Sequence, residues 1–273
     1  MSAHDPHVLL VGCGKMGRAL LAGWIGRGLK AARIAVIEPD AAGAEAARAL
    51  GVMVAADPTG LPANFSPEAI VIAVKPQLMD AVAPAYRPLA EKGAAVLSIA
   101  AGRTLAYFER ALGSNTAVLR AMPNTPAAVG RGITVVAANA RAGAEARALA
   151  ERLLAAVGAV EWVEDESLLD AVTAVSGSGP AYVFLLAESL AEAGRQAGLP
   201  ADLAMRLARA TVAGSGELLH RASEPPAMLR QNVTSPGGTT AAALGVLMAD
   251  DGLQPLMVRA VAAAAKRARE LAG

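Results

Sequence analysis

A glycine-rich turn near the amino terminus constrains the fold of this chain more than any other segment. The apolar run from Val8 to Val11 leads directly into Gly12-Cys13-Gly14-Lys15-Met16-Gly17, and a helical stretch follows. In this Gly-x-Gly-x-x-Gly pattern the first glycine permits a tight turn, the second lets the backbone approach a pyrophosphate, and the third allows close helix–strand packing. The alternative is a glycine-rich turn without a ligand. The position of the pattern, between the first strand and the first helix, favours dinucleotide binding.

An acidic residue follows the second predicted strand, Arg33 to Ile37. Glu38 lies 21 residues after Gly17, close to the spacing at which an acidic side chain meets a ribose 2′-hydroxyl. A carboxylate there repels a 2′-phosphate, so Glu38 favours NADH over NADPH. The alternative is that Glu38 is a solvated charge at the end of a strand.

Apolar strands alternate with helical segments as far as residue 164, which predicts an α/β Rossmann-like domain with a doubly wound parallel sheet. One buried strand, Ala69 to Val74, ends at Lys75-Pro76-Gln77, and the carboxyl end of such a strand faces the cofactor crevice. Lys75 is therefore a candidate contact for the cofactor ribose or the substrate, or else a surface lysine.

A second candidate loop is Met122-Pro123-Asn124-Thr125-Pro126. Two prolines fix a rigid loop that exposes amide and hydroxyl groups. Asn124 is placed to hold a nicotinamide carboxamide, and a purely structural turn fits the sequence equally well.

Helical segments replace strands from residue 165, so we expect a dinucleotide-binding domain over residues 1–164 and an all-α domain over residues 165–273. We expect Ser176-Gly177-Ser178-Gly179-Pro180 to break the first helical segment. The helices carry apolar residues on more than one face, as around Leu185 and Leu186, and a domain of this length has difficulty burying them alone. We therefore expect an interlocked homodimer, with a single compact bundle as the alternative.

The turn Ser235-Pro236-Gly237-Gly238-Thr239-Thr240 leads into a predicted helix, Ala241 to Met248. Two glycines allow close approach of a ligand, and a helix N-terminus offers unpaired N–H groups and partial positive charge. This arrangement predicts a site for a small anion such as a carboxylate. The alternative is a loop with a threonine cap on an ordinary helix.

The amino-acid composition limits the classes of partner and the cellular compartment that we expect for this protein. The 25 basic and 24 acidic residues give a net charge of +1, which offers no reason to expect nucleic acid or an acidic membrane surface. No uninterrupted apolar run reaches membrane-spanning length. Cys13 is the single cysteine, so we expect a reducing compartment and a cytoplasmic protein. The histidines show neither a catalytic triad nor metal-ligand spacing, so no metal is expected.

A nucleotide-binding half followed by a helical half indicates an oxidoreductase in which the cofactor supplies the hydride. The chain offers no convincing acid to protonate an alkoxide, which disfavours a ketone or aldehyde substrate. A substrate already protonated at nitrogen, such as an iminium, needs less help, and Thr240 is placed to hydrogen-bond that nitrogen.

The chain resembles the pyrroline-5-carboxylate reductase family over almost its whole length. The matching stretches are Gly12 to Gly17, Ala73 to Pro76, Met122 to Pro126, Val175 to Tyr182 and Gln231 to Thr240. The resemblance implies reduction of 1-pyrroline-5-carboxylate to L-proline with NADPH or NADH. It also implies a helical dimerisation domain whose helices interlock between subunits, and dimers that often assemble into decamers.

The resemblance assigns roles residue by residue. Thr240 is the catalytic candidate, and the substrate-binding candidates are Ser235, Gly237, Gly238, Thr239 and Ser176. The cofactor-binding candidates are Gly12, Gly14, Lys15, Met16, Gly17, Glu38, Val74, Lys75, Pro76 and Asn124. Many family members carry Ser, Asn, Arg or Thr after the second strand, which suits a 2′-phosphate, whereas this chain has Glu38-Pro39-Asp40.

Two rival functions remain at this point. Dehydrogenases of the 3-hydroxyacid or keto-acid type share the architecture but carry a catalytic lysine in the helical half, and the helix from Ala181 to Ala197 contains no lysine. A non-catalytic nucleotide-sensing protein of the same fold is the other rival. The intact Pro-Gly-Gly-Thr-Thr turn favours retained substrate binding.

Overall fold

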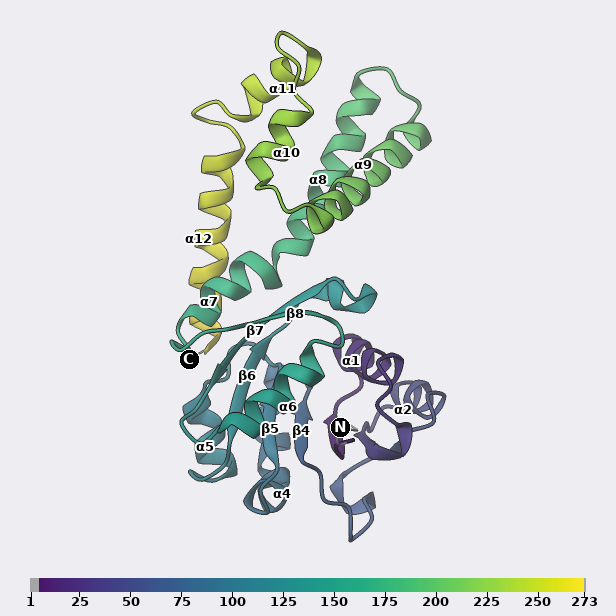
Figure 1. Ribbon diagram of the computed structural model, residues 1–273, viewed down its shortest axis with the longest axis vertical. Coiled ribbons are helices and arrows are strands. Elements are labelled where there is room, and N and C mark those ends of the chain that lie inside the picture. The colour runs from purple at the N-terminus through teal and green to yellow at the C-terminus, as the bar shows by residue number, and fades with distance from the viewer. Residues whose placement is uncertain (1–4, 273) are drawn as a thin grey trace. The chain divides into compact units, whose positions relative to one another are not determined.

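A single eight-stranded sheet organises the amino-terminal part of the chain in the computed structural model, which describes residues 5–272 (Figure 1). The strands are β1 (Val8–Val11), β2 (Ile34–Ile37), β3 (Met53–Ala55), β4 (Ala69–Ile72), β5 (Ala95–Ser98), β6 (Val118–Met122), β7 (Gly132–Ala138) and β8 (Gly158–Trp162). Their spatial order is β3-β2-β1-β4-β5-β6-β7-β8. The sequence runs outward from β1 in both directions, so the expected doubly wound sheet is confirmed.

The central strands are short apolar runs, and every residue of β1, β2, β4 and β5 is buried. Strands with both faces covered read as continuous Val, Ile, Leu and Ala, because neither face meets water. Alternate residues enter different cores: Leu10 packs in one cluster and Leu9 in the other. This alternation follows from the opposite orientation of successive side chains in a strand.

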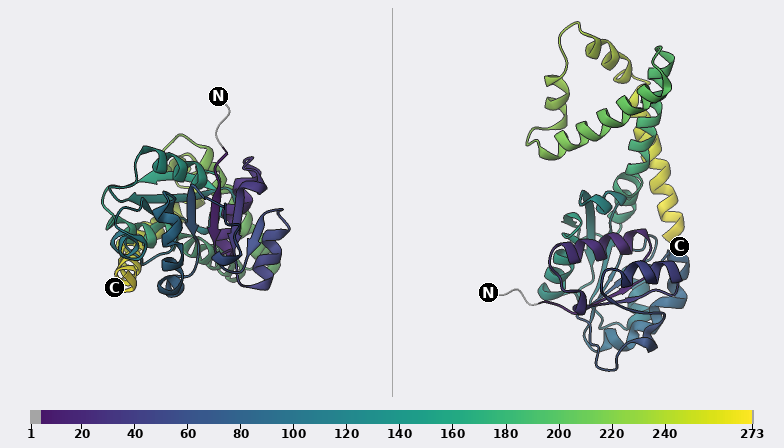
Figure 2. Two further views of the ribbon diagram at one scale, coloured as in Figure 1. Left: turned by 90° about the horizontal axis from the view of Figure 1, so that it is seen from below. Right: turned by 90° about the vertical axis from the view of Figure 1, so that its right-hand side faces the viewer.

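Two helical layers cover the sheet, and Figure 2 shows helices on both of its faces. One layer is α1 (Lys15–Gly26), α2 (Ala41–Arg48) and α6 (Ala144–Leu154), and the other is α3 (Met79–Val82), α4 (Arg87–Glu91) and α5 (Leu105–Leu112). Short 3₁₀ turns complete the connections: η1 (Ala31–Arg33), η2 (Pro58–Gly60), η3 (Pro76–Leu78), η4 (Ala83–Tyr86) and η5 (Thr125–Val129). Trp24 of α1 donates to the carbonyl of Leu153 in α6 at 2.8 Å.

One strand departs from the expected parallel sheet, because β7 pairs antiparallel with β6. A parallel crossover needs a dozen or more residues, usually including a helix. Only the short turn η5 and its flanking residues join Met122 to Gly132, so the chain reverses direction there.

The remaining elements are helical: α7 (Leu168–Val172), a π-helical turn η6 (Thr173–Gly177), α8 (Gly179–Gln196), α9 (Ala201–Arg221), α10 (Pro226–Asn232), α11 (Thr239–Leu247) and α12 (Leu253–Ala272). The chain divides into two compact units. The first runs through Gly177 and includes the end of α12 from Ala265, and the second spans Ser178–Ala264. The boundary that the sequence predicts after residue 164 falls where the strands end, ahead of this division.

The expected break at residues 176–180 takes the form of a π-helical turn and a bend between two α-helices. The chain passes from α7 through the π-helical turn to α8, with a single bend at Ser178. A π turn takes up an extra residue within a helix, and such turns are frequent at functional sites. A Cβ atom on Gly177 would lie 2.5 Å from Cε of Met122, so a larger residue there requires the flexible end of the Met122 side chain to move. Pro180 lies in the first turn of α8, where its missing N–H is tolerated.

Candidate functional site

The glycine turn after β1 is shaped by close backbone contacts. Gly12 has φ of 90°, and a Cβ atom on it would lie 2.9 Å from the carbonyl oxygen of Ala73 and from Cγ1 of Val74. A Cβ on Gly17 would lie 2.3 Å from the carbonyl oxygen of Gly12. Both positions therefore exclude any larger residue. A Cβ on Gly14 would meet no atom of the described chain within 4 Å, which leaves its backbone open to a ligand.

The N-terminus of α1 forms the floor of this turn. Gly14 is the N-cap residue, and the first intrahelical bond runs from the N–H of Arg18 to the carbonyl of Gly14 at 2.9 Å. The preceding N–H groups, including those of Lys15 and Met16, have no intrahelical acceptor. Glycine offers no capping side chain, and the first turn carries basic Lys15 and Arg18. These features fit the diphosphate of a dinucleotide.

Glu38 lies against the same turn. Its Oε2 accepts a hydrogen bond from the N–H of Cys13 at 2.6 Å, and its Oε1 accepts one from the N–H of Asp40 at 2.9 Å. The side chain thus points back from the end of β2 to the glycine turn. Burial, and secondarily the carboxylate of Glu38, raise the pKa of the Cys13 thiol, while Arg18 lowers it.

The strand β4 delivers the next candidate segment. The N–H of Ala73 donates to the carbonyl of Val11 at 2.7 Å, which holds Val74 against the glycine turn. Lys75 is exposed, and Pro76 begins η3. The carboxyl ends of β1 and β4 lie at the same edge of the sheet, because the two strands are parallel neighbours. The segment after β4, Val74 to Pro76, therefore lies at the same edge as the glycine turn.

Arg103 is a residue of this edge that the sequence reasoning missed. Its guanidinium donates to the carbonyl of Pro76 at 3.3 Å and to Asp80 at 2.8 Å, and it lies 4.8 Å from the ring centroid of Tyr107. Burial is the main cause that raises the pKa of Tyr107 to about 12. A cavity of about 290 Å³ in the first unit adjoins these residues, and Pro76, Gly102 and Arg103 are among those lining it. The position of Arg103 just after β5 was the available signal.

Asn124 and Ser176 are brought together. Nδ2 of Asn124 donates to Oγ of Ser176 at 3.2 Å, and Oδ1 of Asn124 accepts from the N–H of Ile133 at 3.0 Å. An amide nitrogen carries two hydrogens, so the bond to Ser176 uses one of two donors.

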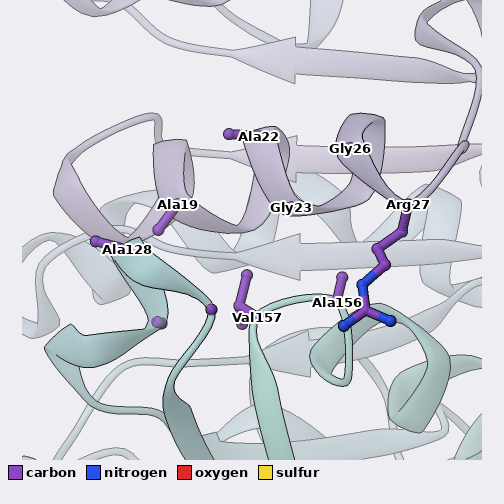
Figure 3. A pocket seen from close by; sticks show the side chains of 10 residues that line it. Ala19, Ala22, Gly23, Gly26, Arg27, Ala128, Ala156 and Val157 are labelled. Carbon is purple, nitrogen blue, oxygen red and sulfur yellow. The ribbon is translucent and has the colours of Figure 1, made fainter. Parts of the chain in front are cut away.

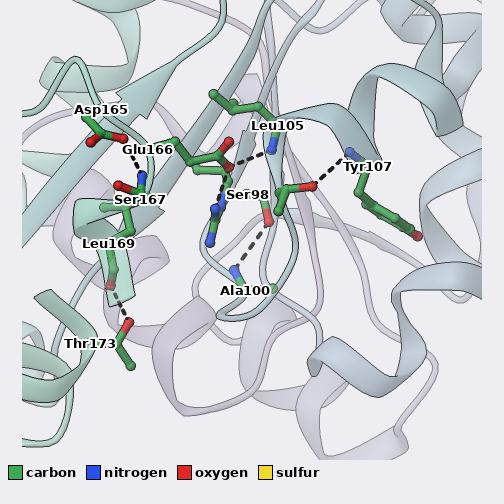
Figure 4. Close-up of polar contacts among 11 residues, drawn as sticks. Ser98, Ala100, Leu105, Tyr107, Asp165, Glu166, Ser167, Leu169 and Thr173 are labelled. Atoms are coloured by element: carbon green, nitrogen blue, oxygen red, sulfur yellow. Dashed lines mark hydrogen bonds and ion pairs between the residues drawn. The ribbon is translucent and has the colours of Figure 1, made fainter. Parts of the chain in front are cut away.

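A partly buried ion pair supports the segment that precedes α7. Arg120 on β6 pairs with Glu166, whose carboxylate also accepts from the N–H of Leu105, the first residue of α5, at 2.7 Å (Figure 4). The Arg120 side chain is 9% exposed. Neither residue was singled out from the sequence, because partners 46 residues apart leave no local pattern.

A separate cavity of about 310 Å³ lies beside α1 and contains none of the predicted site residues. Small residues line most of it, and the Arg27 side chain lies beside Ala156 at one end (Figure 3). Within residues 5–272 there is no group of three or more His, Cys, Asp and Glu side chains suited to a metal ion.

The second unit contains the Pro-Gly-Gly turn. Gly237 has φ of 67°, and the N–H of Gly238 donates to the carbonyl of Ser235 at 3.0 Å. Helix α11 begins at Thr239, two residues earlier than the sequence predicts, with Gly238 as its N-cap. The alternative of a threonine cap is therefore wrong. Because the first intrahelical bond runs from Ala242 to Gly238, the N–H groups of Thr239 and Thr240 lack intrahelical acceptors.

The helical run Leu168–Gln196 is long and apolar enough to cross a membrane by length and composition, with 11% of its most apolar window buried. A single segment of this kind is weak evidence for a membrane span, because the core helix of a soluble protein and a signal sequence pass the same test. In α8, Phe184 is 63% exposed and Leu185 is 61% exposed.

The glycine turn, the uncapped helix α1 and the acidic residue after β2 define a dinucleotide-binding protein of the Rossmann type with an appended helical domain. Comparison with known proteins narrows the class. The family model for pyrroline-5-carboxylate reductase dimerisation matches residues 166–271, and a model described as NADP oxidoreductase, coenzyme F420-dependent, matches residues 7–102.

In sequence, relatives of known name cover up to 98% of the chain. The pyrroline-5-carboxylate reductase of Pseudomonas aeruginosa is 39% identical over 98% of this chain and 97% of its own length, and that of Synechocystis is 46% identical over 77% and 76%. A solved pyrroline-5-carboxylate reductase from Coxiella burnetii matches with a TM-score of 0.92 and 35% identity over 99% of this chain and all of that one. The Plasmodium falciparum pyrroline carboxylate reductase, solved with NADP bound, matches with a TM-score of 0.82 and 28% identity over 98% of this chain and 99% of its own. This chain belongs to the pyrroline-5-carboxylate reductase family.

Proposed function

We propose that this protein reduces the C=N bond of 1-pyrroline-5-carboxylate to give L-proline, the final step of proline biosynthesis, with a reduced nicotinamide dinucleotide. The observation that carries the proposal is the uncapped N-terminus of α11 behind the Pro-Gly-Gly turn, in a chain of this family. That turn provides backbone donors and positive potential for one small anion, which matches the single carboxylate of the substrate.

The residues of this turn divide the work of substrate binding. Ser235 and the backbone around Gly237, Gly238 and Thr239 hold the carboxylate. Thr240, in the first turn of α11, directs its hydroxyl to the ring nitrogen and fixes the face of the imine. Ser176, in the first unit, is a further substrate-binding candidate by family resemblance.

The cofactor-binding candidates fit a nicotinamide dinucleotide. Gly12 to Gly17, with Lys15 and Met16, hold the diphosphate at the N-terminus of α1, where a Cβ on Gly14 would find open space. Val74 to Pro76 line the ribose and nicotinamide region, and the second donor of Asn124 is available to the carboxamide. When bound, the dinucleotide supplies the hydride, which converts a substrate already protonated at nitrogen into a neutral amine.

Glu38 sets the choice between NADH and NADPH. Its carboxylate is anchored by the N–H groups of Cys13 and Asp40, and each carboxylate oxygen retains capacity to accept a further bond from a ribose hydroxyl. A 2′-phosphate at the same place would meet a fixed negative charge. We therefore propose that NADH is the preferred cofactor.

The assembly is a homodimer in the cytoplasm, and such dimers assemble into decamers as the larger form. The exposed apolar side chains of α8, such as Phe184 and Leu185, are covered by the partner subunit. Burial of such a surface is the usual source of stability in obligate dimers. The single buried cysteine, Cys13, suits a reducing compartment. Sedimentation at several protein concentrations tests the assembly.

A substrate panel tests the function against its rivals. The purified protein is mixed with reduced cofactor and either 1-pyrroline-5-carboxylate, a 3-oxo acid or a 2-oxo acid. We expect cofactor oxidation and proline formation in equal amounts with the imine alone. Oxidation with an oxo acid instead would favour the dehydrogenase rival, and cofactor binding without any turnover would favour the nucleotide-sensing rival.

A further inference from the structure

We propose that Gly43 in helix α2 determines cofactor specificity by leaving room for the Glu38 carboxylate, so that Gly43 is a positioning residue. The inference rests on the proposed role of Glu38 in favouring NADH. On this account, the Glu38 side chain can lie at the glycine turn because Gly43, in the neighbouring helix, has no side chain.

The contact is direct. A Cβ atom on Gly43 would lie 2.9 Å from Cγ of Glu38, 3.0 Å from its Cδ and 3.3 Å from its Oε2. Carbon atoms that are not bonded do not approach this closely, because the optimal separation is about 3.5–4.0 Å. Any side chain at position 43 therefore requires the Glu38 carboxylate to move.

The backbone does not call for glycine at this position. Gly43 lies inside α2 in ordinary helical geometry, and its N–H donates to Oδ2 of the N-cap residue Asp40 at 2.9 Å. Every L-residue adopts that geometry, and glycine in a helix interior costs about 1 kcal/mol relative to alanine. The space that Glu38 fills is the feature that explains glycine here.

Displacement of Glu38 breaks the contacts that fix its charge. Oε2 accepts from Cys13 at 2.6 Å and Oε1 accepts from Asp40 at 2.9 Å. We expect a shift of the carboxylate away from Gly43 to lengthen at least one of these two hydrogen bonds. The atoms that must move belong to the end of a flexible side chain, so the fold itself is little disturbed. Gly43→Ala therefore separates the position of the carboxylate from the stability of the protein.

The experiment is equilibrium binding of NADH and NADPH to the purified full-length protein, followed by the fluorescence of the reduced nicotinamide, in the absence of substrate. For Gly43→Ala we expect the Kd for NADH to rise about tenfold, the effect of losing one hydrogen bond to a charged group. The Kd for NADPH stays the same or falls, and the melting temperature does not fall. Gly26→Ala is the matched control, because Gly26 also lies in a helix and a Cβ there would meet no described atom within 4 Å.

Glu38→Ser and the double variant Glu38→Ser/Gly43→Ala complete the test. We expect the double variant to bind both cofactors as Glu38→Ser does, because Gly43 acts only through Glu38. Suppose that the ratio of the Kd for NADH to the Kd for NADPH is unchanged in Gly43→Ala but shifted in Glu38→Ser. That result would overturn the role of Gly43 and leave the proposed function standing. A ratio unmoved in both variants would overturn the role of Glu38 as well. A further shift in the double variant would show that Gly43 acts independently of Glu38 and would also overturn the inference.

Discussion

Nδ2 of Asn124 donates a hydrogen bond to Oγ of Ser176 at 3.2 Å, joining two candidate site residues that lie 52 positions apart in the sequence. Oδ1 of the same amide accepts from the N–H of Ile133 at the start of β7. One side chain therefore ties the loop after β6, the strand β7 and the π-helical turn that leads into α8. The loop after β6 and this turn are held in a fixed relation to each other.

Asn124→Ala is expected to destabilise the protein more than Ser176→Ala. The first change removes both hydrogen bonds and leaves the N–H of Ile133 without its acceptor, at a cost of about 1–3 kcal/mol. The second removes one bond between side chains, worth about 1 kcal/mol. Urea unfolding of the two variants measures the difference. Equal losses of unfolding free energy in the two variants would mean that the hydrogen bond from the N–H of Ile133 does not contribute to stability.

Glu166→Gln is expected to lower the free energy of unfolding by about 3 kcal/mol, because it leaves the buried guanidinium of Arg120 without a counter-charge. Glutamine keeps an oxygen that can still accept from the N–H of Leu105, so the test isolates the charge. Glu192→Gln is the matched control, since Glu192 pairs with Arg195 on the exposed surface of α8 and that change is expected to have little effect. Similar losses of unfolding free energy in the two variants would show that the Arg120–Glu166 ion pair stabilises the protein no more than a surface ion pair does.

Thr240→Val is expected to reduce kcat by at least tenfold while leaving the Kd for the dinucleotide nearly unchanged. The change keeps the shape of the side chain and removes the hydroxyl that we assign to the ring nitrogen, an interaction worth about 1.5 kcal/mol or more with a charged group. Thr211→Val, at an exposed position of α9, controls for the substitution itself. Full activity of Thr240→Val would remove this residue from the site.

The stability of the protein is expected to fall as the pH rises above about 10, and Tyr86 is one cause. The ring is 1% exposed, and burial, followed by the charge of Asp57, raises its pKa above the ordinary value of 10.0. The unfolded chain therefore loses this proton first, and stability declines between the unfolded and folded pKa values by up to about 1.4 kcal/mol per pH unit. Tyr86→Phe should flatten that decline. If the unfolding free energies of the two proteins changed with pH in the same way, the pKa of Tyr86 would be the same in the folded and unfolded states.

Most of the sheet could be predicted because its central strands are buried on both faces. A run such as Ala69–Ile72 is continuous in apolar residues, and the glycine turn after Val11 marks a strand-to-helix connection. The antiparallel direction of β7 was not predicted, because an apolar run in the sequence does not indicate whether the strand pairs parallel or antiparallel with its neighbour. The short connection through η5 was the available signal.

The candidate site could be predicted in part. The glycine turns carry local patterns, and the close contacts at Gly12 and the positive φ of Gly237 supply the physical reasons for those glycines. Arg103, the Arg120–Glu166 pair and the contact of Gly43 with Glu38 were missed. Each depends on side chains that meet through the fold and leave no spacing rule in the sequence.

The most direct measurement is the loss of reduced-nicotinamide absorbance in the presence of 1-pyrroline-5-carboxylate, run in parallel with NADH and NADPH. We expect substrate-dependent oxidation with both cofactors and a higher kcat/KM with NADH, because the Glu38 carboxylate lies at the glycine turn. No oxidation with either cofactor, from folded protein that still binds the dinucleotide, would contradict the proposed reductase function.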